Sequence, residues 1–202
     1  MKIFITGAPK TGTTLLARMF NYFDCKVINE EGNMHDFHKQ KDNGIYVCKR
    51  SENSLFSGAI PADPISKQLE WAKDFKIINV VRDGRDVIHS IYREWGVINP
   101  YIWINSIQSA LKYESYIDLT VKYEDLITHH DLIQRKISQT FGLKKTGSFS
   151  DYPKNIPDDC FKTDKPHYKP RKLEARETNR NFYKTIGLDP KFILDLNEEL
   201  GY

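Results

Sequence analysis

The chain contains few cysteines and no long apolar run. Its three cysteines, Cys25, Cys48 and Cys160, are odd in number and widely spaced, which argues against a disulfide framework and against a zinc site. No stretch approaches the roughly 18 to 20 apolar residues of a membrane-spanning helix, and the apolar stretch at the N-terminus is too short for a signal peptide. We therefore expect reduced thiols, no membrane partner and a cytoplasmic protein.

An excess of one charge sign is also missing. Lysine and arginine total 30 against 27 acidic residues, a net charge of +3, which argues against a nucleic-acid partner on composition alone. Any basic site must therefore be local. Apolar residues make up 40% of the 202 residues, as in an ordinary soluble globular protein, and this length favours a single domain over residues 1–202.

Short apolar runs and amphipathic segments alternate along the chain. Apolar runs bounded by turn residues are typical of buried strands, and they predict strands at residues 3–6, 26–29, 45–48, 77–81 and 119–121. Helical spacing predicts helices at residues 12–23 and 66–75, after residue 84, at about 100–116, before residue 142 and at 190–200. This alternation predicts a three-layer α/β/α fold with a mostly parallel central sheet and a ligand site at the carboxyl ends of the strands.

A glycine-containing loop at residues 7–14 joins the first predicted strand to the first helix. Successive backbone N–H groups and a helix N-terminus form an anion cradle in such a P-loop-like segment, which predicts binding of phosphate or a similar oxyanion. A Walker A motif would place a lysine where this chain has Thr13, whereas Lys10 projects from within the loop. The displaced lysine argues against a magnesium-nucleotide kinase. A turn whose glycines serve geometry alone is the alternative.

A second polar segment, residues 82–90, begins at the carboxyl end of a predicted strand. Arg82 and Ser90 are placed to converge on one oxyanion, because a guanidinium fork and a hydroxyl suit a phosphate group. The segment is equally compatible with a capping and salt-bridge cluster. We assign Arg85 and Asp86 to that structural role.

Three segments together resemble the sulfotransferase family: residues 10–14, residues 80–87 followed by Ser90, and residues 122–126. Their order and spacing match as well, and the resemblance covers about residues 1–127. The family uses 3′-phosphoadenosine 5′-phosphosulfate (PAPS) as donor and releases 3′-phosphoadenosine 5′-phosphate (PAP). The resemblance therefore implies a nucleotide-binding core at residues 1–127, followed by C-terminal helices and a basic segment at 128–202.

The resemblance also implies where the donor binds. The loop would hold the 5′-phosphosulfate, and Arg82 with Ser90 would hold the 3′-phosphate. A late basic segment that in the family folds over the 3′-phosphate is similar to the stretch around Arg171 and Lys172, which lacks the family's glycine; a solvated basic face, a contact to an anionic acceptor and an RNA-binding tail are the alternatives. The implied donor-binding residues are Lys10, Thr11, Gly12, Thr13, Thr14, Arg82, Ser90, Arg171 and Lys172.

The family's chemistry gives the displaced lysine a role. Sulfuryl transfer builds charge on the oxygen that bridges sulfur to the departing phosphate, where Lys10 would stabilise it without a metal. The acceptor hydroxyl needs a base; some members place a glutamate after the second strand, which Glu31, and in second place Glu30, resembles, with His35 as the alternative. Lys49 resembles the family's second lysine. Solvated surface roles are the alternatives for the two glutamates and for Lys49.

The sequence thus predicts a sulfotransferase that moves a sulfuryl group from PAPS to a hydroxyl of an unidentified acceptor, a small molecule or a glycan, by in-line transfer without a metal. An NTP-dependent small-molecule kinase is one alternative. A noncatalytic nucleotide-binding protein is another, because three candidates for the base remain. Residues 122–126 are expected to cap a helix or to brace the nucleotide loops.

Overall fold

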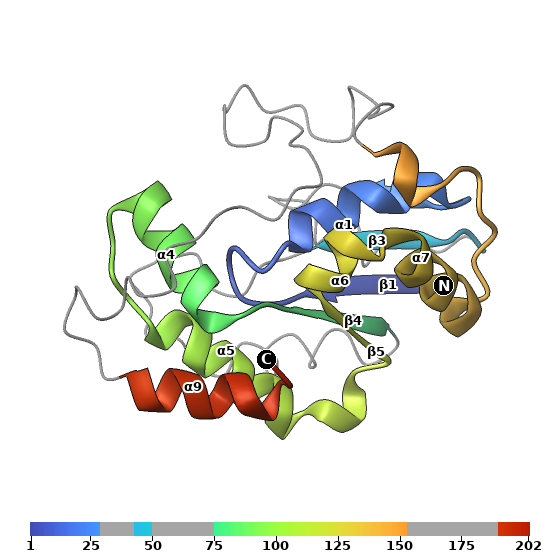
Figure 1. Cartoon of the computed structure of the whole chain (residues 1–202). Helices are drawn as coiled ribbons and strands as arrows, with labels where there is room; N and C mark the ends of the chain where they lie inside the picture. Colours follow the sequence, from blue (N-terminus) through green and yellow to red (C-terminus); the bar gives the residue numbers. More distant parts are fainter. Residues whose placement is uncertain (29–42, 50–74, 153–189) are drawn as a thin grey trace.

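Five parallel strands form a central sheet in the described part of the chain (Figure 1). The computed structural model describes residues 1–28, 43–49, 75–152 and 190–202. All pairs of neighbouring strands are parallel, so their carboxyl ends meet at one edge, where β1 leads into the glycine-containing loop. The strands are β1 (Lys2–Thr6), β2 (Lys26–Ile28), β3 (Tyr46–Lys49), β4 (Lys76–Val81) and β5 (Leu119–Lys122), in the order β2-β3-β1-β4-β5.

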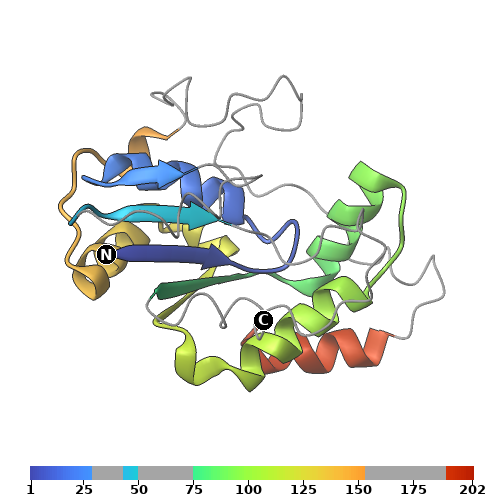
Figure 2. The same ribbon diagram turned by 180° about the vertical axis from the view of Figure 1, so that it is seen from behind.

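Helices cover both faces of the sheet (Figures 1 and 2). On one face lie α1 (Thr13–Met19), α6 (Tyr123–Thr128) and α7 (His130–Phe141); on the other lie α5 (Tyr101–Lys112) and α9 (Pro190–Glu199). α4 (Gly84–Trp95) extends from the carboxyl end of β4 and packs with α5 and α9. The predicted α/β fold with three layers and a parallel sheet is confirmed. None of the helices in the described ranges is long and apolar enough to span a membrane.

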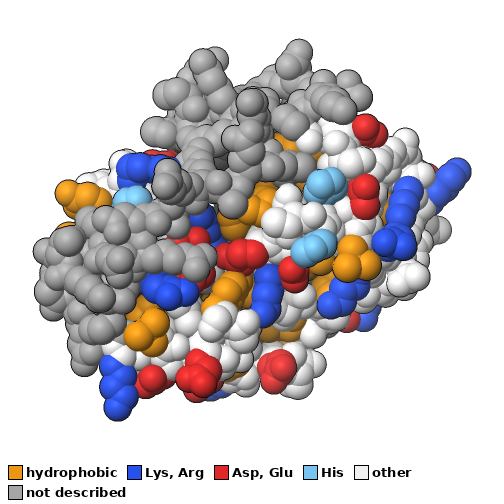
Figure 3. Space-filling view, viewed as in Figure 1, with side chains coloured by type: hydrophobic (Ala, Val, Ile, Leu, Met, Phe, Trp, Pro, Cys, Tyr) orange, Lys and Arg blue, Asp and Glu red, His pale blue; other side chains and the backbone are white. Residues whose placement is uncertain are grey.

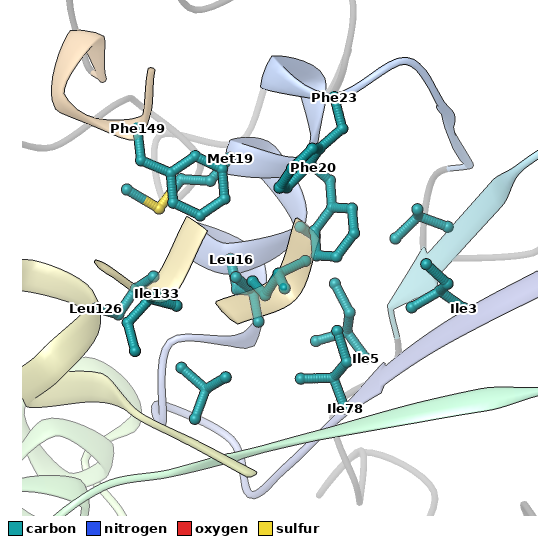
Figure 4. Close-up of a cluster of buried hydrophobic side chains, with 14 of the residues drawn as sticks. Ile3, Ile5, Leu16, Met19, Phe20, Phe23, Ile78, Leu126, Ile133 and Phe149 are labelled. Carbon is teal, nitrogen blue, oxygen red and sulfur yellow. The ribbon is translucent and has the colours of Figure 1, made fainter. Parts of the chain in front are cut away.

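An apolar cluster between the sheet and α1 fixes the base of the loop (Figure 4). The alternation of side chains along β1 and β4 sends Ile3, Ile5 and Ile78 into this cluster, which they share with Leu16 and Met19 of α1. Burial of each such side chain stabilises the fold by roughly 1.5 to 3 kcal/mol. Because the strand and the helix are both anchored here, the loop between them has two fixed ends.

Two predicted helices end earlier than expected. The helix expected at residues 12–23 turns into a 3-10 helix, η1 (Phe20–Tyr22), and stops because Phe23 is extended and bridges Lys145. The helix expected at about 100–116 is α5, which ends at Lys112, and a 3-10 helix, η3 (Glu114–Tyr116), follows it. Apolar spacing continues across both interruptions, so the sequence pattern does not reveal them.

Other predictions fall outside the described ranges. The helix expected at residues 66–75 is described only at Phe75, which forms a bend before β4. Two short segments were not expected as regular structure. One is α6 (Tyr123–Thr128), and the other is η4 (Phe149–Asp151), which follows α7 and places the buried Phe149 ring against Phe23 of the core, 5.5 Å between ring centroids.

Candidate active site

Two glycines shape the loop between β1 and α1. Gly7 and Gly12 have φ values of 149° and 100°, which glycine adopts far more readily than other residues. A Cβ atom on Gly7 would lie 2.3 Å from the backbone oxygen of Val80, and one on Gly12 would lie 2.5 Å from Cδ2 of Tyr123. The loop therefore lies directly against the end of β4 and the start of α6, an approach that other residues at these positions would block.

Lys10 lies at the tip of this loop in a strained backbone conformation. Its φ of 71° is the one positive φ among the described non-glycine residues, and such a conformation costs roughly 1 kcal/mol. The Nζ atom lies 2.5 Å from Oε1 of Glu94 and 5.0 Å from the ring centroid of Trp95. Both side chains of the ion pair are largely buried, so the end of α4 holds the Lys10 ammonium close to the loop.

The threonines of the loop have different surroundings. Thr11 is buried, and its hydroxyl donates a hydrogen bond to the backbone oxygen of Ala8 at 2.7 Å, so this side chain fastens the loop internally. Thr13 is buried and Thr14 half-buried in the first turn of α1, which has no side-chain cap. The first N–H groups of a helix have no partner within the helix, an arrangement suited to an anion.

Arg82 connects the second motif to the loop. Its Nη1 atom donates a hydrogen bond to the backbone oxygen of Lys10 at 3.1 Å, and its guanidinium stacks 4.3 Å from the ring centroid of Tyr123. Nη2 lies 3.7 Å from Oδ2 of Asp86. The side chain is 5% exposed, and its Nε has no hydrogen-bond partner in the described ranges. A buried guanidinium with a donor to spare fits a phosphate oxygen.

One face of α4 runs along the loop. Asp86 contacts Arg82, and Glu94, eight residues later, contacts Lys10. Ser90 lies between them at four-residue spacing, which in a helix places all three side chains on the same face. This spacing places Ser90, which is buried, on the side of α4 whose other residues contact Arg82 and Lys10.

Lys49 ends β3 directly beside the loop. It pairs in register with Ile5 of β1 and is 4% exposed. Burial, together with the positive charges of Lys10 and Arg18, lowers the pKa of this lysine from 10.5 to about 7. The predicted second lysine is thus a buried group close to other cations and not a surface lysine.

Asp83 and Gly84 form the turn that follows Arg82. The Asp83 carboxylate accepts a hydrogen bond from the Arg85 backbone N–H at 2.9 Å and pairs with the Arg85 guanidinium. Burial alone would raise the pKa of Asp83, but the hydrogen bonds and charge of Arg85 hold it below its ordinary value. The structural roles expected of Arg85 and Asp86 agree with these contacts.

The segment 122–126 contacts both the glycine-containing loop and the turn after Arg82, which agrees with the bracing role, one of the two roles expected of it. Tyr123 lies under the Arg82 guanidinium and against Gly12. Glu124 accepts a long hydrogen bond, 3.4 Å, from the backbone N–H of Asp83.

Sequence reasoning missed Glu94 and Arg18. Glu94 repeats the four-residue spacing of Asp86 and Ser90, a signal that the sequence does contain. Arg18 is the one charged residue of α1, is buried and is close enough to affect Lys49; nothing in the sequence distinguishes it from a surface arginine.

Several predicted site residues lie outside the described ranges: Glu30, Glu31, His35, Arg171 and Lys172. Within the described ranges no group of three or more histidine, cysteine or acidic side chains is arranged to hold a metal ion. On the surface seen in Figure 3, acidic, basic and apolar side chains of the described residues are interspersed. The cations Lys49 and Arg82 are buried, so they contribute little to the surface.

Comparison with known proteins identifies the family. The family model described as the sulfotransferase domain matches residues 1–184, which is most of the chain. The chain therefore belongs to the sulfotransferase family, and the predicted family and enzyme class are confirmed. No curated protein sequence matches the chain.

Two solved structures are similar to the fold. The sulfotransferase domain from the olefin synthase of Synechococcus PCC 7002 has a TM-score of 0.67 and 17% sequence identity, covering 100% of this chain and 95% of that chain. The crystal structure of retinol dehydratase in complex with androsterone and inactive cofactor PAP has a TM-score of 0.43 and 11% identity, covering 99% of this chain and 79% of that chain. The first likeness supports the fold, and the second is too distant to carry an argument.

Proposed function

We propose that this protein transfers the sulfuryl group of PAPS to a hydroxyl of an acceptor, a small molecule or a glycan, by in-line displacement that needs no metal. The observation that carries the proposal is the contact between two motifs distant in the sequence, in which Arg82 donates a hydrogen bond to the backbone oxygen of Lys10 at 3.1 Å. The segments to which the resemblance assigns the two ends of the donor are therefore in direct contact.

The residues around the loop fit an anionic donor. The glycines allow the loop to approach its neighbours closely, and the buried Arg82 keeps one N–H donor without a described partner. Lys49 is buried near Lys10 and Arg18, which is costly for like charges in the free protein and is relieved by a bound anion.

In the proposal, each part of the donor has its own set of residues. The loop N–H groups with Thr13 and Thr14 hold the 5′-phosphate, with Thr11 keeping the loop in shape. Arg82 and Ser90 hold the 3′-phosphate, and Arg171 with Lys172 fold over it.

The chemical step is an exchange of one oxygen–sulfur bond for another. The acceptor oxygen forms a bond to sulfur while the bond from sulfur to the bridging oxygen breaks, and the electron pair of that bond passes to the phosphate oxygen. Lys10 leaves its ion pair with Glu94 to contact the donor and stabilises this charge. Lys49 adds positive charge nearby. The proton of the acceptor passes to the base, Glu31 by preference, with Glu30 and His35 as the other candidates.

Calorimetric titration with PAP in the presence of EDTA tests the proposal. We expect PAP to bind without a divalent cation, because cationic side chains and backbone N–H groups supply the anion site. A folded protein that does not bind PAP at high micromolar concentration would contradict the proposal. Binding of ATP that requires Mg²⁺ would favour the kinase, and tight PAP binding without transfer to any acceptor in a broad panel would favour a noncatalytic protein.

The domain organisation belongs to the same proposal. One domain over residues 1–202, with a nucleotide-binding core at 1–127, predicts a single cooperative unfolding transition. A cytoplasmic location and the absence of a nucleic-acid partner stay predictions.

A further inference from the structure

The last described segment of the chain, residues 190–202, contacts the turn that carries Arg82. α9 packs with α4 and α5, and both views place the chain end near the strands (Figures 1 and 2). This segment lies beyond residues 1–184, which the sulfotransferase domain matches. Its contacts with the nucleotide motif therefore come from a part of the chain to which the family match assigns no role.

Asn197 of α9 holds both residues that follow Arg82. Its Oδ1 atom accepts a hydrogen bond from the backbone N–H of Gly84 at 2.9 Å, and its Nδ2 atom donates one to Oδ1 of Asp83 at 3.0 Å. Asn197 is 2% exposed and Asp83 is 1% exposed. An uncharged carboxamide offers a donor and an acceptor at once, so this one buried side chain hydrogen-bonds to both Asp83 and Gly84 of the turn.

Trp103 completes the support of this turn. Its Nε1 atom donates a hydrogen bond to the backbone oxygen of Arg82 at 3.1 Å, and its ring fills the space beside Gly84, where a Cβ atom would lie 2.7 Å from ring carbons. The backbone oxygen of Arg82 and the backbone N–H of Gly84 are therefore both hydrogen-bonded by buried side chains, Trp103 of α5 and Asn197 of α9.

Tyr202 contacts the segment whose Tyr123 ring stacks on Arg82. Its hydroxyl donates a hydrogen bond to Oε2 of Glu124 at 2.7 Å. Burial raises the pKa of Tyr202, and the hydrogen bond and charge of Glu124 raise it further, so the hydroxyl keeps its proton and remains a donor. Glu124 adjoins Tyr123, the ring on which the Arg82 guanidinium stacks. Lys122 joins the contact, with Nζ 3.1 Å from the backbone oxygen of Gly201.

We propose that Asn197, assisted by Tyr202, is a positioning residue for the 3′-phosphate of the donor, because it fixes the turn that aims Arg82. The inference rests on the proposed function, in which Arg82 holds that phosphate. A charge-assisted hydrogen bond between a guanidinium and a phosphate depends on alignment. A turn that loses its buried support therefore presents the same guanidinium less well aligned.

The test compares two nucleotides that differ in the 3′-phosphate, PAP and adenosine 5′-phosphate. Calorimetry with the full chain measures the affinity for both in the wild type, Asn197→Ala, Arg82→Ala and the double variant. We expect Asn197→Ala to weaken PAP binding about tenfold and to change binding of adenosine 5′-phosphate by less than about twofold, since the latter lacks the group that Arg82 holds. The double variant should bind PAP no more weakly than Arg82→Ala alone, because residues that act through one another are not additive.

Glu198→Ala, an exposed neighbour on α9, is the matched control and should leave both affinities unchanged. If Asn197 has a merely structural role, Asn197→Ala should lower the melting temperature and weaken the binding of both nucleotides equally. That outcome would overturn the inference. If Asn197→Ala does not fold, Tyr202→Phe carries the same comparison, because it removes one hydroxyl and keeps the ring beside Lys122.

The outcomes separate the inference from the proposed function. If Arg82→Ala loses the preference for PAP while Asn197→Ala keeps it, the inference is wrong and the proposed function stands. If Arg82→Ala keeps the preference, the assignment of the 3′-phosphate to Arg82 is wrong, and the inference falls with it.

Discussion

Lys10 is the lysine of the loop, three positions before Thr13, where a Walker A motif has its lysine. The structure gives it a positive φ, an ion pair with Glu94 and a ring contact with Trp95. Strained residues are retained where the surroundings fix them, often at functional sites. The ion pair places a competing anion next to the ammonium that the proposal assigns to the leaving oxygen.

Lys10→Ala should lower kcat by about a hundredfold or more, because a preorganised charge contact in the transition state is worth on the order of 3 kcal/mol. Steady-state sulfuryl transfer from PAPS measures the effect, with Lys136→Ala on the exposed side of α7 as the control. A turnover equal to that of the wild type would refute the role of Lys10.

Glu94→Gln should strengthen PAP binding, because the substitution removes a carboxylate that pairs with Lys10 at 2.5 Å and competes with the nucleotide for it. We expect a gain of roughly fivefold in affinity by calorimetry at low salt. Glu114→Gln, an exposed glutamate of η3, controls for the loss of one negative charge. Weaker binding by Glu94→Gln would mean that the carboxylate orients the lysine instead of competing for it.

Lys49 predicts a pH dependence of stability in the free protein. Burial, with the charges of Lys10 and Arg18, lowers its pKa to about 7 from 10.5. Between these values the unfolded chain binds more protons than the folded one, so the free energy of unfolding gains from this group as the pH rises from about 7 toward 10. Urea unfolding at pH 7 and pH 9 should show a larger gain in the wild type than in Lys49→Met. An equal gain in both proteins would contradict the lowered pKa.

At the scale of elements, the loop depends on the structure around it. Its glycines approach β4 and Tyr123 so closely that a methyl group does not fit. The apolar cluster around α1 fixes one end of the loop and β1 fixes the other. Packing therefore constrains the loop at both ends and along its glycines.

Gly12→Ala tests this close approach against a matched glycine. Gly12 has a φ of 100° and meets the Tyr123 ring, whereas Gly96 has a φ of 66° and a methyl group there would meet no heavy atom within 4 Å. We expect a loss of about 2 to 4 kcal/mol in the free energy of unfolding for Gly12→Ala and about 1 kcal/mol for Gly96→Ala, measured by urea denaturation. Equal losses would show that backbone strain alone explains both.

The strands and the end of α7 at Gly142 were predictable from the sequence, whereas the early ends of two other helices were not. The five strands have apolar runs ended by polar or turn residues, a local signal that the sheet preserves. The early end of the first helix follows from the bridge between Phe23 and Lys145, a contact between distant residues. Propensity cannot reveal such a contact.

The site divides in the same way. Motif spacing identifies Lys10, Arg82 and Ser90 as candidates, and Glu94 continues a helical spacing that the sequence contains. The burial of Arg18 and the two hydrogen bonds of Asn197 depend on packing between segments far apart in the chain. No local pattern predicts them.

At the scale of the whole molecule, a parallel sheet brings three separate segments to one edge. The loop after β1, the turn after β4 and Lys49 at the end of β3 converge there, and α9 closes the turn from beyond the matched family domain. A nearly neutral chain can therefore hold a cationic site, because the cations gather in the interior at one edge of the sheet.

A crystal structure of the protein with PAP tests the central claim most directly. We predict the 5′-phosphate in the loop at residues 7–14, and the 3′-phosphate within hydrogen-bond distance of Arg82 and Ser90, with Lys10 turned from Glu94 to the nucleotide. PAP bound elsewhere, or bound with its 3′-phosphate away from Arg82, would contradict the account.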